Sequence, residues 1–254
     1  MTASPSSTAS TASVALVTGA SRGIGAAIAA RLARDGHAVA VNYASNQTEA
    51  QKVVDAIVAA GGRAVAVQGD VSDPAAARGL FDAVEAQLGP VTVLVNNAGI
   101  MPPALPRLAD TEDEAFDRLF AINVKGSFNT MREASRRMAS GGRIVNFSSS
   151  VIGLALPGYA IYAATKAAIE TMTNILAKEL RGKNITVNAV APGPTATALF
   201  LNGKTPEQIE TLSRMAPLER LGRPEDIAAL VAVLAGPDGA WINGQTLRAN
   251  GGIV

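Results

Sequence analysis

The segment VALVTGASRGIGAAIAARLARDG, residues 14–36, decides the fold predicted for this chain. It opens with a short apolar run of the kind found in buried strands, continues into a glycine-rich turn over residues 18–25, and ends in an amphipathic stretch that predicts a helix over residues 24–35. A glycine turn between a strand and a helix leaves free helix N–H groups and the positive end of the helix dipole at the turn. This arrangement suits a bound pyrophosphate.

The rest of the chain repeats the same order of strand and helix, which predicts parallel strands joined by crossover helices. The predicted strands are VALV (14–17), AVAV (38–41), RAVAVQ (63–68), VTVLVNNAG with its loop (91–99), GRIVNFS (142–148), ITVNAVAPG (185–193) and QTLRA (245–249). The predicted helices cover 24–35, 48–60, 74–88 with Asp73 as cap, 111–137 with an interruption at Gly126, 159–181 and 225–235, and a flexible insert with one short helix covers 194–217.

This pattern predicts an α/β fold with one Rossmann-type, doubly wound parallel sheet flanked by helices on both faces. Residues 14–254 form the single dinucleotide-binding and catalytic domain in this prediction, because no linker separates a second one. The small, polar opening MTASPSSTASTAS, residues 1–13, is expected to be a disordered tail.

Composition excludes several classes of function. Lysine and arginine number 22 against 21 acidic residues, so the chain has no broad basic surface for nucleic acid. It has no cysteine and only one histidine, His37, which excludes disulfides and a histidine metal site, and we expect no metal. The opening residues lack the features of a secretory signal, and no apolar run has the length of a membrane span. We therefore expect a cytoplasmic protein that acts on a small molecule.

A second stretch, NFSSSVIGLALPGYAIYAATK over residues 146–166, carries the side chains suited to proton transfer. Tyr162 and Lys166 are four residues apart in a predicted helix, so both lie on one face. A neighbouring ammonium is expected to lower the phenol pKa from its usual value of about 10, which would make Tyr162 a general acid or base. Ser149 and its neighbours end the apolar run GRIVNFSS, and a hydroxyl there could hydrogen-bond a substrate oxygen. By itself, a Tyr-x-x-x-Lys spacing also fits an ordinary helix surface.

Several motifs occur in a fixed order along nearly the whole chain: TGASRGIG (18–25), Asn96-Asn97-Ala98-Gly99, Asn123, Ser149, Tyr162-x-x-x-Lys166 and Pro192-Gly193. Together they resemble the classical short-chain dehydrogenase/reductases, in the branch of 3-oxoacyl reductases and glucose dehydrogenases. The resemblance implies hydride transfer between a nicotinamide cofactor and a carbonyl or secondary alcohol, with Tyr162 as the acid or base.

The resemblance also implies roles for individual residues. The catalytic set is Asn123, Ser149, Tyr162 and Lys166, and Asn123 would fix a water that links Lys166 to solvent. Family spacing to the tyrosine selects Ser149 rather than Ser148 or Ser150. The cofactor-binding set is Gly19, Ser21, Arg22, Gly23, Ile24, Gly25, Asn42, Tyr43, Ala44, Ser45, Asp70, Val71, Asn97, Ala98, Gly99, Tyr162, Lys166, Pro192, Gly193, Thr195 and Thr197. In it, Asp70 and Val71 would hold the adenine.

The end of the second predicted strand indicates which dinucleotide is used. Enzymes that prefer NAD place a carboxylate there to bind the ribose hydroxyls. This chain has Asn42-Tyr43-Ala44-Ser45 instead, and Arg22 supplies a cation in the glycine turn. A guanidinium suits a phosphate, and Asn42 and Ser45 could add neutral hydrogen bonds. The sequence therefore predicts NADP(H).

The substrate side is predicted to be apolar. The residues expected at its rim are Met101, Pro102, Pro103, Leu154, Leu156, Tyr159, Leu199, Phe200, Leu201, Leu212 and Met215, and the substrate-binding set drawn from them and the catalytic residues is Ser149, Leu154, Tyr159, Tyr162, Leu199 and Phe200. A hydrophobic ketone fits this rim, and a 3-oxoacyl thioester of a carrier protein or CoA is the alternative.

Two other classes were weighed. A cofactor-sensing regulator without turnover is expected to lack a catalytic residue, whereas the set is complete here. An extended-type epimerase needs a larger C-terminal domain. The resemblance further implies a homotetramer, in which helices over 123–138 and 160–180 pair across a two-fold axis and the segment WINGQTLRANGGIV contributes to a second interface. Both helices carry small or apolar residues on faces that a monomer would leave exposed, for example Ala164, Ala168, Met172 and Ile175.

Overall fold

The computed structural model describes residues 13–102 and 104–254, and a seven-stranded parallel sheet forms its centre. The strand order is β3-β2-β1-β4-β5-β6-β7, and every neighbouring pair is parallel. The strands are β1 (Val14–Val17), β2 (Ala38–Tyr43), β3 (Arg63–Gln68), β4 (Val91–Asn96), β5 (Arg143–Phe147), β6 (Thr186–Pro192) and β7 (Thr246–Ala249). All seven predicted strands are present, and the predicted fold class is confirmed.

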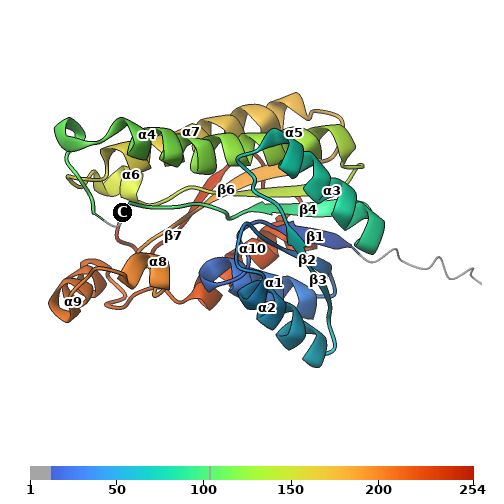
Figure 1. Cartoon of the computed structure of the whole chain (residues 1–254), viewed down its shortest axis with the longest axis horizontal. Helices are drawn as coiled ribbons and strands as arrows, with labels where there is room; N and C mark the ends of the chain where they lie inside the picture. Colours follow the sequence, from blue (N-terminus) through green and yellow to red (C-terminus); the bar gives the residue numbers. More distant parts are fainter. Residues whose placement is uncertain (1–12, 103) are drawn as a thin grey trace, which may run out of the picture.

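Helices cover both faces of this sheet. Figure 1 shows α3, α5 and α7 on one face and α1, α2 and α10 on the other. The helices are α1 (Gly23–Arg34), α2 (Gln47–Ala59), α3 (Pro74–Leu88), α4 (Asp113–Leu119), α5 (Gly126–Arg137), α6 (Val151–Leu154), α7 (Ala160–Glu179), α8 (Ala198–Leu201), α9 (Pro206–Met215) and α10 (Pro224–Ala235), with shorter turns η1 (Leu108–Asp110), η2 (Phe120–Lys125) and η3 (Pro237–Gly239).

The interior strand β1 explains why the core has two halves. Successive side chains of a strand point to opposite faces. Ala15 and Val17 accordingly belong to the core beneath α1, α2 and α10, whereas Val14 and Leu16 belong to the core beneath α3, α5 and α7. All four are buried. The uninterrupted apolar run in the sequence is therefore required, because both faces of β1 are covered.

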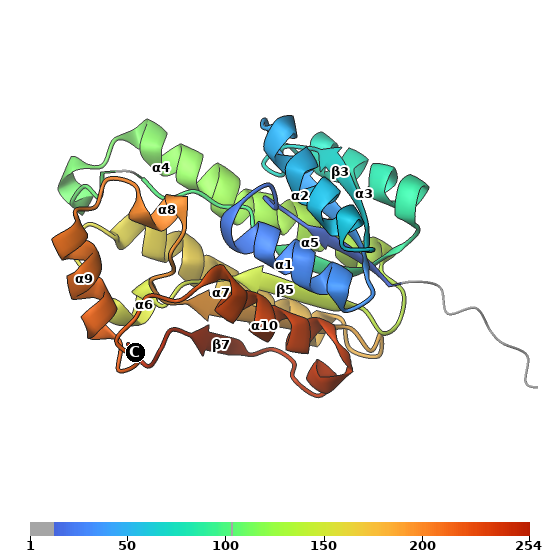
Figure 2. The ribbon, with the colours of Figure 1, turned by 90° about the horizontal axis from the view of Figure 1, so that it is seen from below.

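The chain order reverses between β1 and β4, and this creates a crevice. The connection from β1 leads toward β2 and the one from β4 leads toward β5, so their loops separate at the carboxyl edge of the sheet. Helices α8 and α9 lie beyond this edge, as seen from two sides in Figures 1 and 2. Ligands of open parallel sheets bind in such a crevice.

Three details differ from the sequence prediction. The helix predicted over 111–137 consists of α4, a π-helical segment η2 and α5, and Gly126 does not interrupt it. The insert over 194–217 contains two helices, α8 and α9, rather than one. Helix α6 was not predicted at all, because four residues after a serine run give no periodic signal.

The predicted disordered tail lies mostly outside the described residues, which begin at Ser13. The Ser13 hydroxyl is 2.6 Å from Thr92 Oγ1 and 2.9 Å from His37 Nδ1. These contacts fix the start of β1 to the start of β4. His37 therefore takes part in anchoring this end of the sheet. Among the described residues, no helix combines the length and apolarity needed to cross a membrane.

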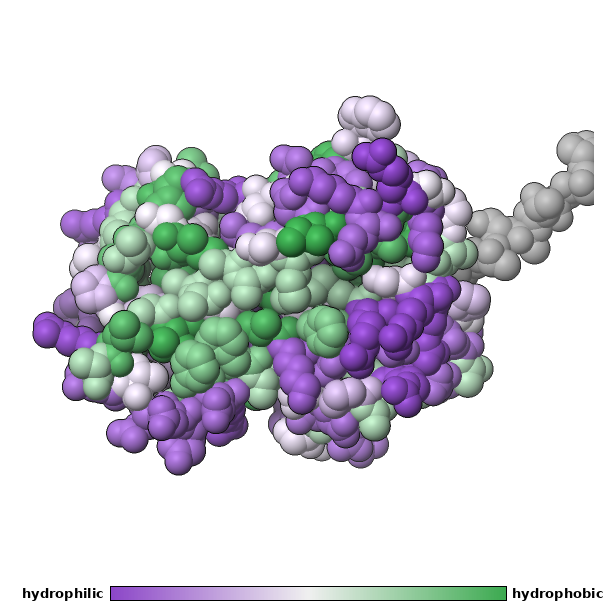
Figure 3. Space-filling view, turned by 90° about the horizontal axis from the view of Figure 1, so that it is seen from above, coloured by the Kyte–Doolittle hydropathy of each residue, from purple (hydrophilic) through white to green (hydrophobic). Residues whose placement is uncertain are grey.

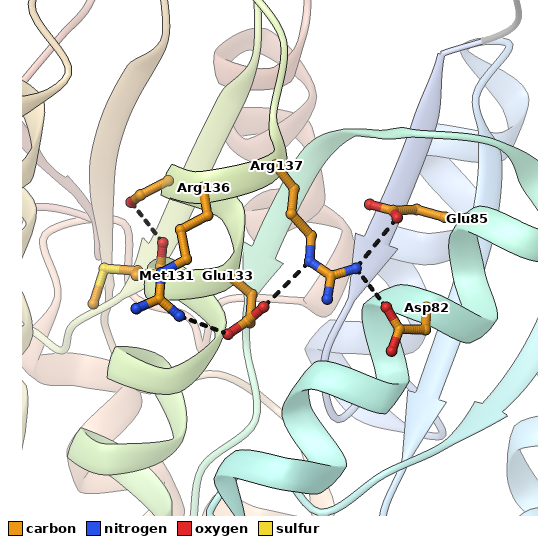
Figure 4. Close-up of polar contacts among 7 residues, drawn as sticks. Asp82, Glu85, Met131, Glu133, Arg136 and Arg137 are labelled. Carbon is orange, nitrogen blue, oxygen red and sulfur yellow. Dashed lines mark hydrogen bonds and ion pairs between the residues drawn. The ribbon is translucent and has the colours of Figure 1, made fainter.

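A charge network joins α3 to α5 on one face of the sheet (Figure 4). Arg137 donates to Asp82 at 2.6 Å and to Glu85 at 3.3 Å on α3, and its Nε donates to Glu133 at 3.2 Å. Glu133 is buried, and its Oε1 also accepts a hydrogen bond from the Arg136 guanidinium at 3.5 Å. A buried carboxylate is tolerated when it is paired and hydrogen-bonded in this way. The network holds the two helices in one layer.

Gly126 permits close packing between α5 and the loop after β3, and this gives the first prediction. A Cβ at Gly126 would lie 2.7 Å from Val71 Cγ2. We expect Gly126→Ala to lower the free energy of unfolding by about 1–3 kcal/mol through overpacking. Gly79, exposed within α3 and with nothing near its Cβ position, is the matched control. Gly79→Ala should stabilise by about 0.5–1 kcal/mol. Urea unfolding of both variants measures the difference, and equal effects would contradict the packing argument.

Candidate active site

The glycine turn between β1 and α1 is fixed to the end of β2 by Asn42. The Gly19 amide donates to Asn42 Oδ1 at 3.2 Å, and the Ala20 amide donates to the Asn42 carbonyl at 2.8 Å. Asn42 Nδ2 donates to the Val67 carbonyl at 3.3 Å and the Gly69 carbonyl at 3.0 Å. The expectation that this amide contacts a phosphate is corrected here, because the side chain is buried and already engaged on both of its polar atoms. Asn42 positions the turn.

The loop after β4 closes against the same turn. Asn97 Nδ2 donates to the carbonyls of Thr18 and Gly19 at 2.9 and 3.0 Å. A Cβ at Gly25 would lie 2.5 Å from Asn97 Nδ2 and 2.6 Å from the Gly19 carbonyl oxygen, so only glycine fits there. This contact explains why the second half of the glycine motif needs glycine, and it places Asn97 beside the start of α1.

The N-terminus of α1 is suited to an anion. The helix is twelve residues long, has no acidic residue in its first turn and has no side-chain hydrogen bond at its cap, Arg22. The first N–H groups of such a helix have no partner within it. Arg22 is exposed, and Tyr43 is buried at the end of β2 beside exposed Ala44 and Ser45. The chain thus supplies a cation and a helix dipole, with no carboxylate at the strand end.

The three serines after β5 have different partners. Ser148 Oγ donates to Glu170 Oε1 on α7 at 2.6 Å. Ser150 Oγ donates to the Ala191 carbonyl at 3.0 Å and accepts from Asn250 Nδ2 at 3.0 Å. Ser149 is half-buried and accepts from the Val151 amide at 3.3 Å. Its hydroxyl also acts on the Tyr162 phenol, whose pKa it lowers. The serine chosen from the sequence is the one beside the phenol, while its neighbours hold the loop in place.

Tyr162 and Lys166 lie on the same face of α7, as their spacing predicts. Lys166 Nζ lies 5.7 Å from the centroid of the Tyr162 ring and donates to the Phe147 carbonyl at 3.0 Å. Lys166 is buried, although no carboxylate pairs with it among the described salt bridges. The side chain therefore crosses from α7 to the end of β5 and joins the helix to the serine strand.

Burial controls the acidity of both groups. Burial raises the pKa of Tyr162 to about 12, against the opposing effect of the Ser149 hydrogen bond, and the neighbouring Tyr159 raises it further. Burial also lowers the pKa of Lys166 to about 8. The Tyr162 pKa is therefore raised in this structure, whereas the sequence predicted that it is lowered, and loss of solvation is the largest cause. At neutral pH the phenol is protonated and the amine carries its proton.

Asn123 lies in the π-helical segment η2 and binds the loop after β4. Its Oδ1 accepts from the Ile100 amide at 2.8 Å, and its Nδ2 donates to the Ile100 carbonyl at 2.9 Å and to Thr165 Oγ1 at 3.2 Å. A Cβ at Gly99 would lie 3.3 Å from Asn123 Oδ1 and 3.6 Å from Lys166 Nζ, so the two side chains meet at this glycine. Wide helical turns of this kind are frequent at functional sites.

One cavity at the carboxyl edge of the sheet joins these parts. Its lining comprises Ile24, Asn97, Gly99, Ile100, Met101, Phe147, Ser148, Ser149, Ser150, Val151, Leu154, Leu156, Tyr159, Tyr162, Lys166, Pro192, Gly193, Pro194, Thr195, Thr197, Leu199, Phe200 and Leu212. All six members of the predicted substrate-binding set line it. Of the wider predicted rim, Pro102, Leu201 and Met215 do not line it, and Pro103 lies outside the described residues.

The predicted cofactor-binding residues lie along the same edge in two groups. Those that line the cavity are Ile24, Asn97, Gly99, Tyr162, Lys166, Pro192, Gly193, Thr195 and Thr197. The others lie in the loops after β1, β2, β3 and β4, in the first turn of α1 or at the end of β2, and they are Gly19, Ser21, Arg22, Gly23, Gly25, Asn42, Tyr43, Ala44, Ser45, Asp70, Val71 and Ala98. Over the described ranges no cluster of histidine and acidic side chains could hold a metal ion.

Sequence reasoning missed the partners that hold the catalytic residues. Glu170 and Asn250 anchor the serines on either side of Ser149, and the Phe147 carbonyl anchors Lys166. Glu170 falls four residues after Lys166, so its place on the same helix face was a usable signal. Asn250 lies about one hundred residues from its partner Ser150, and nothing in the local sequence links them.

The arrangement can donate a proton to a bound oxygen. A hydroxyl at Ser149 and a protonated phenol at Tyr162 face one apolar cavity, and a buried cation stands behind them. Two donors beside one position stabilise a developing alkoxide. The helix N-terminus with its glycine turn lies at the other end of the same edge, so an anionic group could be bound there at the same time.

Comparison with known proteins agrees with this geometry. A family model described as enoyl-(acyl carrier protein) reductase matches residues 19–254. A short-chain type dehydrogenase/reductase of Picea abies is 47% identical over 249 residues, covering 95% of this chain and 92% of that protein. An NADPH-dependent aldehyde reductase-like protein, chloroplastic, of Arabidopsis thaliana is 46% identical, covering 95% of this chain and 94% of that protein.

A similar solved structure is a short-chain dehydrogenase from Burkholderia cenocepacia J2315 in complex with NADP. It is 41% identical, its TM-score is 0.88, and the match covers 95% of this chain and 97% of that chain.

The buried ammonium of Lys166 makes stability depend on pH. Its pKa is about 8 in the folded chain against 10.5 ordinarily, so between these values the unfolded chain binds the extra proton. Stability relative to a Lys166→Met variant should therefore rise with pH through this window, by about 3 kcal/mol in total. Urea unfolding at several pH values measures the difference. Lys178→Met, on the exposed side of α7, is the matched control. A difference that does not change with pH would contradict the burial of the charge.

Proposed function

This chain belongs to the short-chain dehydrogenase/reductase family, and on that premise we propose that it is an NADP(H)-dependent reductase of an uncharged, hydrophobic ketone. The observation that carries the proposal is the meeting of Ser149, Tyr162 and Lys166 in one apolar cavity at the carboxyl edge of the sheet. The names of the Arabidopsis thaliana relative and the Burkholderia cenocepacia structure support the cofactor. The same residues would serve the oxidation of the alcohol in reverse.

In the proposed reaction Tyr162 donates its phenolic proton to the carbonyl oxygen as negative charge develops there. Ser149 donates a hydrogen bond to the same oxygen and keeps it within reach of the phenol. The NADPH nicotinamide, when bound, supplies the hydride. Because burial raises the pKa of Tyr162 to about 12, the acid form is present across the neutral range. Reduction therefore needs no prior change in protonation, whereas oxidation requires a phenolate that burial disfavours.

Lys166 has a supporting role in this proposal. Its ammonium lies behind the phenol and against Gly99 and the Phe147 carbonyl, where it can bind a ribose hydroxyl of the cofactor. Its position beside Asn123 also allows the proton of Tyr162 to be restored through a water, as the family resemblance implies.

The residues present fit a 2′-phosphorylated dinucleotide. The glycine turn, which Asn97 packs against at Gly25, and the uncapped N-terminus of α1 suit the pyrophosphate. At the end of β2 no carboxylate competes with a ribose phosphate, and exposed Arg22 and Ser45 supply a cation and a hydroxyl. The Asn42 side chain is excluded from this set because it holds the glycine turn.

The thioester alternative has less support from the cavity. A 3-oxoacyl group on a carrier brings phosphate and acidic surface, for which a basic rim is expected. Among the described residues that line the cavity, Lys166 alone is charged, and it is buried. Lys204, next to α8, donates to the Phe200 carbonyl at 2.7 Å and lies over the Phe200 ring. A free hydrophobic ketone therefore fits better.

Turnover with a panel of carbonyl compounds tests the function. NADPH oxidation is followed with aryl ketones, keto esters and 3-oxoacyl thioesters, and Tyr162→Phe serves as the inactive control. We expect the aryl ketones to react and the control to lose at least about 100-fold in kcat, because it lacks the acid but keeps the ring. Cofactor binding by the control should persist in a fluorescence titration. A Tyr162→Phe enzyme with wild-type turnover would refute the assigned acid.

Arg22 provides a separate test of cofactor choice. Losing one charge-assisted contact to phosphate costs about 1.5–3 kcal/mol, and solvent screening at this exposed position reduces that value. We expect Arg22→Ala to raise the NADPH Michaelis constant about tenfold and to leave that of NADH unchanged. Arg34→Ala, exposed at the far end of α1, is the matched control. A wild type that uses NADH more efficiently than NADPH would overturn the proposed specificity.

We further propose that four copies of the chain associate. The face formed by α4, α5 and α7 exposes Phe116, Phe128 and Ile175, and Ala164 lies exposed on α7. Figure 3 looks at this face from above and shows a hydrophobic band across it. Exposed apolar surface of this kind marks association sites. The face includes the helices that the family resemblance assigns to a two-fold interface.

Light scattering tests the assembly. We expect a particle mass near four times the 25.9 kDa of one chain. Ile175→Glu, which places a charge on the exposed face of α7, should reduce the mass to that of a smaller species. Val58→Glu, an equally exposed position on α2, is the control and should leave the mass unchanged. A wild-type particle of one chain would reject the proposal.

A further inference from the structure

We propose that Tyr159 is a specificity-determining residue, whose hydroxyl donates a hydrogen bond to a second, uncharged oxygen of the substrate. That oxygen lies on the carbon next to the reacting carbonyl or one carbon further. The inference rests on the proposed function and narrows its substrate class to dicarbonyl compounds and their close analogues.

Tyr159 lies beside the catalytic tyrosine. It stands at the cap of α7, one turn before Tyr162, and the two rings meet edge to face with centroids 6.5 Å apart. Both rings line the cavity that contains Ser149 and Lys166. A carbonyl held by Ser149 and Tyr162 therefore has the Tyr159 ring as its neighbour.

The other polar side chains of the cavity are largely engaged within the protein. Ser148 donates to Glu170, Ser150 to the Ala191 carbonyl, Asn97 to the glycine turn and Lys166 to the Phe147 carbonyl. Thr195 and Thr197 donate to the carbonyls of Gly193 and Thr195. Tyr162 and Ser149 both bind the reacting oxygen in the proposed reaction, so neither is free for a second one.

Tyr159 differs from these side chains in its hydrogen bonding. Within residues 13–102 and 104–254, no hydrogen bond of its hydroxyl to another residue is present. The side chain is only half-buried, yet burial raises its pKa, so the hydroxyl keeps its proton and remains a donor. A phenol in an apolar cavity gains from a partner that the substrate supplies, and a substrate without one leaves the donor unpaired.

The backbone that carries Tyr159 is held in place by tight packing at Gly158. Gly158 has a φ of +85°, and a Cβ there would lie 2.5 Å from the Leu105 carbonyl oxygen, so the loop before α7 packs tightly against the loop after β4. Tyr159 also forms part of a wall with Val151 and Leu156, since all three line both the main cavity and a second hollow over α7. A donor fixed in this way recognises its acceptor without a large entropic cost.

The charge of the second oxygen follows from the lining. Among the described residues around the cavity there is no arginine, histidine or carboxylate, and Lys166 already lies behind the catalytic tyrosine. An ionised group would therefore be buried without a counter-charge, which is costly. A ketone, ester or phenol oxygen fits, whereas a carboxylate does not.

Matched pairs of ketones test the inference with the intact enzyme. Benzil is compared with deoxybenzoin, and ethyl benzoylacetate with 3-ethoxypropiophenone, because the members of each pair differ only in the second carbonyl oxygen, which is replaced by CH2. For Tyr159→Phe we expect kcat/KM to fall about three- to tenfold on the dicarbonyl member of at least one pair and to change less than about twofold on its partner. The pair that responds identifies the spacing of the two oxygens.

The outcomes separate this inference from the proposed function. A wild type that reduces neither member of either pair, nor any other ketone, defeats the proposed function itself. If the wild type reduces these ketones, the result for Tyr159→Phe decides the role of Tyr159. A variant whose kcat/KM falls equally on both members of both pairs, or falls on neither member, contradicts that role and leaves the proposed function intact. Equal losses would indicate that the hydroxyl merely supports Tyr162. Tyr162→Phe is the control that should abolish turnover of all four compounds.

Discussion

The contact between the Lys166 ammonium and the Phe147 carbonyl holds the active site together. It spans from the long helix α7 to the end of β5, and so it fixes the helix that carries Tyr162 relative to the strand that leads to Ser149. The contact is buried, which makes it strong and also makes the charge costly. Glu170 repeats the link one turn further along α7 by binding Ser148. The distance between acid and serine is therefore set by two bridges across the same gap.

The core between the sheet and helices α5 and α7 contains one network of buried polar side chains. Asn96 Nδ2 donates to Asn146 Oδ1 at 2.8 Å, and Thr130 Oγ1 donates to Asn96 Oδ1 at 2.6 Å. Asn146 Nδ2 in turn donates to Thr173 Oγ1 at 2.8 Å. All four side chains are buried and satisfied, so they connect β4 and β5 to α5 and α7 in one register. Apolar side chains could fill the same space but would not specify which residues meet.

The sequence predicted the sheet well because each strand needs an apolar run and each crossover needs a helix, and both signals are local. It also predicted which residues reach the carboxyl edge, since strand ends meet there. It misassigned Asn42, because an amide at a strand end looks the same whether it binds a ligand or a neighbouring loop, and only the three-dimensional contacts with Gly19 and Gly69 decide. The direction of the Tyr162 pKa shift was mispredicted for a similar reason. The pKa is raised by desolvation, and desolvation depends on everything packed around the ring.

The strand order also has a consequence during synthesis of the chain. β1 is made first, yet in the sheet it lies between β2 and β4, and β4 begins at Val91. Ribosomes add about 5–20 residues per second, so one edge of this fully apolar strand waits several seconds for its neighbour. An unpaired apolar strand edge can associate with other chains. We therefore expect the newly made N-terminal half to depend on protection by chaperones until β4 has emerged.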